Sequence, residues 1–250
     1  LKDNLYKKSN EIIVFAKNKI GYKNLVNLSN IINNCVTENP ERLINLEVLV
    51  KYKEGLIALS GGPENGFVGF HAGEQNYDIS LKRSQILKES FNKDFYIEIQ
   101  RTGIKRDLIA EPMLIELAYK LNVPIVATND SYFKSSNDFE SHEVLMMIDK
   151  GQTISANKTR YLSKENYLKT NSEMIELFQD IPEAITNSLI IAKRCSFMLE
   201  EQKPLLPKFV TSNNNKTEDD MLKDLSISGL KKRLDVISFN KDKNTEKYFQ

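Results

Sequence analysis

The sequence is poor in cysteine and histidine, and it has no long run of apolar residues. It contains two cysteines and two histidines in 250 residues. Cys35 and Cys195 lie far apart in the chain, which is typical of a reduced cytosolic protein whose thiols fill apolar space. No apolar run approaches the roughly 20 residues that span a membrane, and no signal peptide is visible. These absences favour a cytoplasmic protein over a secreted or membrane protein.

The sequence also lacks an excess of charge of either sign. Its 35 Lys and Arg residues balance 34 Asp and Glu residues, so the net charge is +1. Without a strong basic field, any contact with nucleic acid is local or is made by parts outside this sequence. The short basic cluster at 231–233 is more typical of a solvated helix face than of a nucleic-acid contact. A start at Leu1 and an end within an expected helix indicate a piece of a longer protein.

Short apolar segments alternate with amphipathic segments in the first half of the chain. We expect strands at 12–16, 56–60, 95–99 and 125–128. We expect helices at 22–34, 39–55, 79–91 and 112–121. The spacings are too long for hairpins, so the pattern predicts a parallel sheet or barrel with its helices outside. Beyond residue 138 we expect helices at 138–150, 172–179, 182–194 and 218–234, with a linker at 202–216.

The motifs of several common enzyme classes are missing. Residues 61–73 form a glycine-rich loop, but this loop lacks the Lys-Ser/Thr ending of a phosphate-binding P-loop. The sequence contains no Ser nucleophile elbow and no neighbouring pair of catalytic carboxylates. His71 in the loop and His142 on an expected helix have no second His or Cys at ligand spacing. The sequence therefore favours none of these chemistries.

Asp130 is the strongest single candidate for a functional residue. It follows the apolar strand expected at 125–128, and the carboxyl ends of strands are where α/β barrels keep their chemistry. The carboxylate could bind a metal or orient a water, or it could cap an Asn-Asp turn. Tyr132, at the position that would suit a second metal ligand, is a poor ligand for zinc or manganese.

Glu98 is a second candidate carboxylate. It lies inside the strand expected at 95–99, on the face opposite Ile97 and Ile99. In a barrel it could point into the lumen and pair with Arg101, which would make it a structural ion pair. We also expect Glu98 and Asp130 to lie at the same end of the sheet.

Seven segments of the sequence resemble, in the same order, one protein family. They are VFAKNKIGYKNLVNLS, EGLIALSGG, FYIEIQRTG, PIVATNDSYF, SHEVLMMIDKGQTI, EMIELFQDIPEAITNSLIIAKRC and LLPKF. These segments are similar to the alpha subunits of bacterial replicative DNA polymerase III, and the resemblance covers about residues 11–234. It implies an α/β fold: a distorted, seven-stranded β/α barrel of the polymerase-and-histidinol-phosphatase (PHP) type, its N-terminal part missing, followed by helical segments.

The resemblance implies three parts along the chain. Residues 1–201 correspond to the PHP domain, as the C-terminal part of the barrel plus its helical extension. Residues 202–216 correspond to a linker. Residues 217–250 correspond to the truncated start of the polymerase palm region, whose catalytic carboxylates lie further along the family's sequence.

The resemblance also implies a degenerate metal site. Asp130 matches the Asp of the family's Asn-Asp-x-His motif, and Tyr132 replaces the His. Gly62 stands where the family's Ser-Gly-Cys supplies a Cys, and Glu11 stands where a His is common. Each lost donor weakens binding of a metal cluster. We therefore expect no functional metal site, only a vestigial position at Asp130, and no catalytic or cofactor-binding residue in this sequence.

The full subunit would synthesise DNA on a primer–template with two Mg²⁺ ions. The resemblance implies that this segment is catalytically silent. It would stabilise the subunit and dock the proofreading exonuclease subunit of DNA polymerase III. No interaction with a membrane is expected. The alternative is an active PHP metallohydrolase with 3′–5′ exonuclease or pyrophosphatase activity, against which the changes at Tyr132, Gly62 and Glu11 weigh. A stand-alone phosphoesterase of the wider PHP superfamily fits less well, because the helical part and LLPKF match the polymerase.

Overall fold

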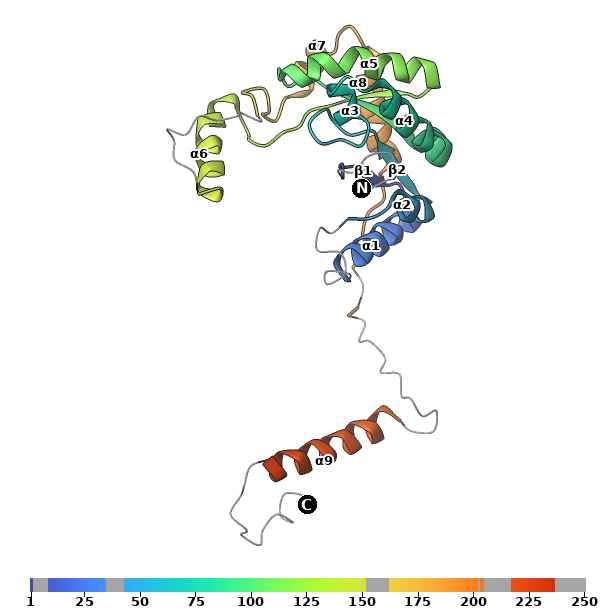
Figure 1. Ribbon diagram of the computed structural model, residues 1–250, viewed down its shortest axis with the longest axis vertical. Coiled ribbons are helices and arrows are strands. Elements are labelled where there is room, and N and C mark those ends of the chain that lie inside the picture. Colours follow the sequence, from blue (N-terminus) through green and yellow to red (C-terminus); the bar gives the residue numbers. More distant parts are fainter. Residues whose placement is uncertain (2–8, 35–42, 152–161, 202, 205–216, 237–250) are drawn as a thin grey trace. The chain divides into compact units, whose positions relative to one another are not determined.

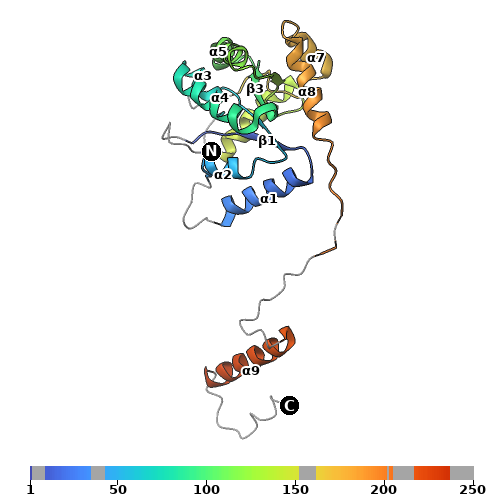
Figure 2. The same ribbon diagram turned by 90° about the vertical axis from the view of Figure 1, so that its right-hand side faces the viewer.

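The computed structural model describes residues 1, 9–34, 43–151, 162–201, 203–204 and 217–236. Three earlier expectations lie wholly or mostly outside the described residues: the packing of Cys35, the helix start at 39–41 and the linker at 202–216. The chain divides into two compact units, Leu1–Met198 and Leu199–Gln250. The first unit contains a four-stranded sheet with its helices, and the second contains one described helix (Figures 1 and 2).

The sheet is mixed rather than fully parallel. Its strands are β1 (Ile13–Ala16), β2 (Leu56–Leu59), β3 (Phe95–Gln100) and β4 (Ile125–Thr128), and they pair in the order β1-β2-β3-β4. The strands lie within one residue of the expected bounds. β2, β3 and β4 are parallel, but β1 runs antiparallel to β2, so the expectation of a parallel arrangement is wrong for β1. The spacing between β1 and β2 excludes a tight hairpin, but it does not exclude an antiparallel return through two helices.

Most helices lie close to their expected positions, with three corrections. The described helices are α1 (Lys19–Asn34), α2 (Leu46–Lys51), α3 (Gly69–Gly73), α4 (Tyr77–Phe91), α5 (Lys105–Leu121), α6 (Phe139–Asp149), α7 (Asn171–Leu177), α8 (Pro182–Arg194) and α9 (Glu218–Val236). The helix expected at 39–55 spans only 46–51, because the described residues 43–45 and 52–55 are not helical. The glycine-rich loop contains the short helix α3, which was not expected. Helix α5 begins seven residues before Pro112, so the expected start at 112 is wrong. None of the helices within the described ranges combines the length and apolarity needed to cross a bilayer.

The early start of α5 has a local cause. The Asp107 carboxylate accepts hydrogen bonds from the backbone N–H and the hydroxyl of Thr102, both at 2.6 Å. This pair holds the turn between β3 and the first turn of α5. Pro112 then lies in the helix interior, where a proline removes one backbone hydrogen bond. It is tolerated because it lies on the exposed side of the helix, away from the core residues Leu114 and Leu117.

Two apolar clusters cover the two faces of the sheet. The larger one joins the Ile97 and Ile99 face of β3 to Leu87 of α4 and to Leu114 and Leu117 of α5, all almost fully buried. Burying a side chain of this size stabilises the fold by about 1.5–3 kcal/mol. The smaller cluster lies on the opposite face, and its buried members include Ile57, Leu59, Tyr96, Val126 and Ile191. Helix α8, which carries Ile191, packs along β4.

Candidate functional site

A pocket of about 550 Å³ lies at the edge of the sheet where the parallel strands end. Gly61 and Gly62 follow β2, Gln100 ends β3, and Asp130 follows β4, so three carboxyl ends meet there. Glu11 joins them from the start of the antiparallel strand β1. The orientation of β1, which the sequence pattern did not predict, is therefore what places Glu11 at the pocket.

The loop after β2 holds Glu11 through its backbone. The N–H of Glu11 donates to the Asn65 carbonyl at 2.8 Å, and the Phe67 N–H donates to the Glu11 carbonyl at 2.7 Å. The loop turns at Gly61, whose φ of +78° favours glycine. Gly66 packs so tightly that a Cβ there would lie 2.2 Å from the Gly61 carbonyl carbon. The glycine-rich loop is therefore a tightly packed wall of the pocket.

Glu98 lies beneath this edge, with 1% of its surface exposed. Its Oε1 atom accepts hydrogen bonds from the Thr128 hydroxyl at 2.5 Å and from the Gln100 amide at 2.8 Å. Among the described residues, Oε2 has no hydrogen-bond partner. Burial raises the pKa of Glu98, the hydrogen bonds from Thr128 and Gln100 oppose this, and the nearby Asp130 charge raises it again. The prediction that Glu98 and Asp130 lie at the same end of the sheet is confirmed.

The expected pairing of Glu98 with Arg101 is wrong. Side chains three positions apart on an extended chain point to opposite sides, so the two residues diverge. The Arg101 guanidinium instead forms ion pairs with Glu111 of α5 at 2.5 Å and with Asp180 at 2.6 Å. Glu98 is thus a buried carboxyl held by neutral donors, and its interpretation as a structural ion pair is wrong.

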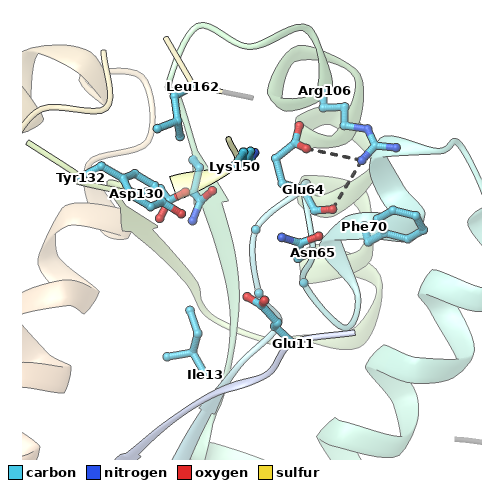
Figure 3. Close-up of a pocket in the computed structure, with 14 residues that line it drawn as sticks. Glu11, Ile13, Glu64, Asn65, Phe70, Arg106, Asp130, Tyr132, Lys150 and Leu162 are labelled. Carbon is cyan, nitrogen blue, oxygen red and sulfur yellow. Dashed lines mark hydrogen bonds and ion pairs between the residues drawn. The ribbon is translucent and has the colours of Figure 1, made fainter. Parts of the chain in front are cut away.

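Asp130 and Tyr132 lie together on one side of the pocket, facing Glu64 and Arg106 on the other (Figure 3). The Tyr132 side chain lies beside the Asp130 carboxylate (Figure 3). Burial is the main cause that raises the pKa of both groups, and the neighbouring Tyr132 hydroxyl partly offsets this rise for Asp130. The fully buried Asn166 fixes the segment 130–132. Its side-chain amide donates to the backbone carbonyl of Asp130 at 2.8 Å, and its backbone carbonyl accepts from the Tyr132 N–H at 2.9 Å.

The far wall carries charged residues that sequence reasoning missed. Arg106 forms ion pairs with Glu64, at 3.6 Å, and with Glu74, and Lys150 also lines the pocket. These residues come from the loop after β2, from α5 and from the end of α6. No motif joins them in the sequence, so only the tertiary arrangement could identify them.

The two histidines do not contribute to this pocket's lining. His71 is buried in α3 and meets the Phe70 ring edge-on, with centroids 5.3 Å apart. His142 of α6 packs on Tyr132 and Phe133, at centroid distances of 5.9 and 5.5 Å. Both contacts are typical of aromatic packing.

The residues present do not fit the metal cluster that the resemblance implies. Gly62 offers no donor, and a Cβ at that position would lie 2.2 Å from Oε1 of Gln100. A phenol with a raised pKa stays protonated, so Tyr132 is a poor ligand for a cation. Within the described ranges, no three His, Cys, Asp or Glu side chains are arranged to hold a metal ion. The site is a hydrogen-bonded pocket with one implied ligand, Asp130, retained.

Comparison with known proteins gives one consistent result. A family model described as "PHP domain" matches residues 2–102. The chain is 35% identical over 229 residues to "DNA polymerase III subunit alpha" of Caulobacter vibrioides, covering 92% of this chain and 20% of that protein. It is 39% identical over 228 residues to the protein of the same name from Pseudomonas aeruginosa, covering 90% and 19%. For the Borreliella burgdorferi protein, the identity is 33% over 235 residues, covering 92% and 20%. The chain spans about a fifth of the length of these curated relatives.

Proposed function

We propose that this chain is the PHP region of a replicative polymerase, because its residues 2–102 match the PHP domain model and nine tenths of its length is similar to DNA polymerase III alpha subunits. In this proposal the full subunit synthesises DNA on a primer–template in the cytoplasm, with Mg²⁺ bound by carboxylates outside this sequence. The PHP region itself is catalytically silent. It stabilises the subunit and docks the proofreading exonuclease subunit.

The observation that carries the proposal is the pocket at the edge of the sheet. It retains Asp130, but a tyrosine, Tyr132, stands beside this carboxylate (Figure 3), and Gln100 fills the space beside Gly62. A metal-dependent hydrolase needs cations to activate water and to bind phosphate oxygens. A pocket that retains one of the implied ligands, Asp130, and pairs another acid, Glu64, with Arg106 supports neither function, whereas its tightly packed wall supports a rigid platform.

The proposal extends to the fold and the domain boundaries. We infer that the four described strands form part of a PHP-type barrel, since the edge strand β1 leaves Ile13 and Phe15 about 40% exposed on the face that would line its lumen. Residues 1–201 would form the PHP region, 202–216 a linker, and 217–250 the start of the palm region.

Elemental analysis tests the proposed loss of the metal cluster. After dialysis, the purified protein should contain well below one equivalent of zinc, manganese or iron per chain, because a single retained carboxylate binds such ions weakly. A PHP protein with a complete ligand set, treated in the same way, is the control for metal lost during dialysis. Two or three metal ions per chain, together with metal-dependent 3′–5′ exonuclease or pyrophosphatase activity, would contradict the proposal and favour the metallohydrolase.

A further inference from the structure

The pocket at the edge of the sheet keeps a surplus of negative charge. Five charged residues line it: Glu11, Glu64, Asp130, Arg106 and Lys150. Arg106 is already paired with Glu64 and with Glu74, a carboxylate outside the lining. Three carboxylates of the lining therefore face two cations, one of which is shared with a further acid. A pocket with this balance attracts a cation and repels an anion such as phosphate.

Two of these acids, Glu11 and Asp130, have no ion-pair partner among the described residues. They reach the pocket from different elements, Glu11 from just before β1 and Asp130 from the segment after β4 (Figure 3). Burial is the main cause that raises the pKa of Asp130, and the charge of Glu11 adds to this rise. The two carboxylates therefore repel each other, and a cation between them would remove the repulsion.

The polar atoms that the chain leaves over in this pocket are hydrogen-bond acceptors. The Nε2 atom of Gln100 donates to Glu98 and to Thr128. The Oε1 atom of Gln100 lies beside Gly62 and has no donor within the described part of the chain. Together with the two carboxylates, it forms a set of oxygen atoms that require donors. An ammonium group has three donors and no acceptor, so it matches this set.

One metal ion would not suit these acceptors. Within the described ranges, no third His, Cys, Asp or Glu joins Glu11 and Asp130 in a metal-binding arrangement. An ion such as Mg²⁺ requires near-ideal octahedral geometry with oxygen ligands at about 2.0–2.1 Å. An ammonium group accepts looser geometry, because each N–H forms its own hydrogen bond at about 2.7–2.9 Å. Two carboxylates on separate elements are therefore better bridged by two linked ammonium groups than by one ion.

An apolar side chain accompanies each of the two carboxylates. Ile13 follows Glu11 by two residues, Tyr132 follows Asp130 by two residues, and all four line the pocket. Ile13 and Tyr132 are 37% and 52% exposed, so both offer surface to a ligand. Methylene groups between two ammonium groups would remove this surface from water. The volume of about 550 Å³ is within the range of sites for small organic molecules.

We propose that the pocket at the edge of the sheet binds a linear aliphatic diamine. One ammonium group pairs with Glu11, and the other pairs with Asp130 and Gln100. The methylene chain between them lies along Ile13 and Tyr132. The ligand is thus an organic dication in a pocket whose residues do not fit a metal cluster. This inference goes beyond the proposed function and does not depend on the docking role.

Isothermal titration calorimetry of the full alpha subunit tests the proposal, with butane-1,4-diamine as the probe, at low ionic strength and in the presence of EDTA. The diamine should bind about tenfold or more tightly than butylamine, because butylamine has the same chain with only one ammonium group and loses one set of charge-assisted hydrogen bonds. Butane-1,4-diol, which has no charge, should show no measurable binding.

Glu11→Gln and Asp130→Asn are matched variants, since each removes one charge and keeps the shape of the side chain. Glu11 is exposed and Asp130 is partly exposed, so neither substitution burdens folding, which circular dichroism checks. Each should weaken diamine binding about tenfold or more and remove most of its advantage over butylamine. Glu89→Gln removes a carboxylate from an exposed position of α4 outside the lining. It should change diamine affinity by less than about twofold, because solvent screens distant surface charges.

Hydrogen exchange with mass spectrometry locates the diamine on the full subunit without any substitution. Peptides that contain residues 9–16 and 129–133 should exchange more slowly when butane-1,4-diamine is added, because the ligand ties the two segments together. Butane-1,4-diol should leave their exchange unchanged.

Four results would overturn the proposal. The first is an absence of diamine binding to the wild type. The second is equal diamine affinity of the wild type, Glu11→Gln and Asp130→Asn, which would place the diamine elsewhere on the subunit. The third is equal affinity for the diamine and butylamine, which would show that a single ammonium group, such as that of a lysine side chain, is sufficient. The fourth is slower exchange of the same two segments with magnesium chloride in place of the diamine and EDTA, which would assign the pocket to a metal ion.

Discussion

At the scale of single residues, the central feature is a carboxyl that is buried without a cation. Glu98 receives two hydrogen bonds on one oxygen and none on the other within the described part of the chain. A buried carboxylate in this setting is costly when ionised, because two neutral donors replace only part of its lost hydration. The neutral form is therefore favoured in the folded protein, in agreement with the raised pKa.

This raised pKa predicts how stability responds to pH. Above the ordinary glutamate pKa of 4.5, the unfolded chain releases the proton that the folded chain still holds. The contribution of Glu98 to the free energy of unfolding therefore falls as pH rises, until pH passes the folded pKa. Glu98→Gln removes this contribution, so the variant should gain stability relative to wild type as the pH rises above the ordinary glutamate pKa of 4.5.

Urea denaturation at several pH values measures this effect. Glu89→Gln, at an exposed position of α4, is the matched control and should leave the pH profile unchanged. Parallel pH profiles for wild type and Glu98→Gln would contradict the assignment of Glu98 as a proton-holding group.

At the scale of elements, Arg101 connects parts that are far apart in the sequence. It lies just after β3, forms a bidentate contact with Glu111 of α5, and reaches Asp180 and the Leu177 carbonyl at the end of α7. Its guanidinium also lies 4.7 Å from the centroid of the fully buried Phe178 ring. One planar cation thus joins the sheet, α5 and the α7–α8 pair.

A lysine at position 101 should not be able to make the contacts that the arginine makes. An ammonium group has three donors and no planar fork, so it cannot satisfy two carboxylates and a carbonyl together. Arg101→Lys should lower the free energy of unfolding by about 1–3 kcal/mol, as measured by urea denaturation. Arg106 pairs with Glu64 and Glu74 at the surface. Arg106→Lys should therefore lower the free energy of unfolding by less than about 1 kcal/mol. Equal losses for the two variants would contradict the linking role of Arg101.

At the scale of the whole molecule, the second unit differs from the first in how it uses apolar residues. Helix α9 leaves Leu222 and Leu225 66% and 57% exposed, whereas the residues of β4 are buried or nearly so. An amphipathic helix is stabilised mainly by tertiary packing of its apolar face. A helix whose apolar face is exposed opens easily.

Hydrogen exchange should therefore distinguish α9 from β4. We expect the amides of α9 to exchange fastest among the helices and strands of this chain, and those of 125–128 to be among the slowest. Mass spectrometry of peptides after a series of labelling times measures both segments in one experiment. Exchange of α9 as slow as that of β4 would place it in the PHP region and contradict the boundary at 202–216.

The local parts of this fold and site could be predicted from the sequence. Strand bounds follow from short apolar runs, because a buried strand needs little more than alternation or a continuous apolar segment. The position of Asp130 at the end of β4 follows from the same pattern. The resemblance, carried by seven local segments, agrees with the PHP domain match and the polymerase relatives. The start of α5 could not be predicted locally, because the Thr102–Asp107 contact outweighs the proline signal.

The long-range parts were decided only by the tertiary structure. The direction of β1 depends on how α1 and α2 return the chain, and this direction brings Glu11 to the pocket. The partners of Glu98 depend on the pairing of β3 with β4, which places Thr128 beside it and leaves Arg101 on the other side. By itself the sequence determined where the strands and most helices lie and which family they match, since those depend on neighbours along the chain. Which side chains meet was determined by contacts between segments many residues apart, for which local patterns hold no information.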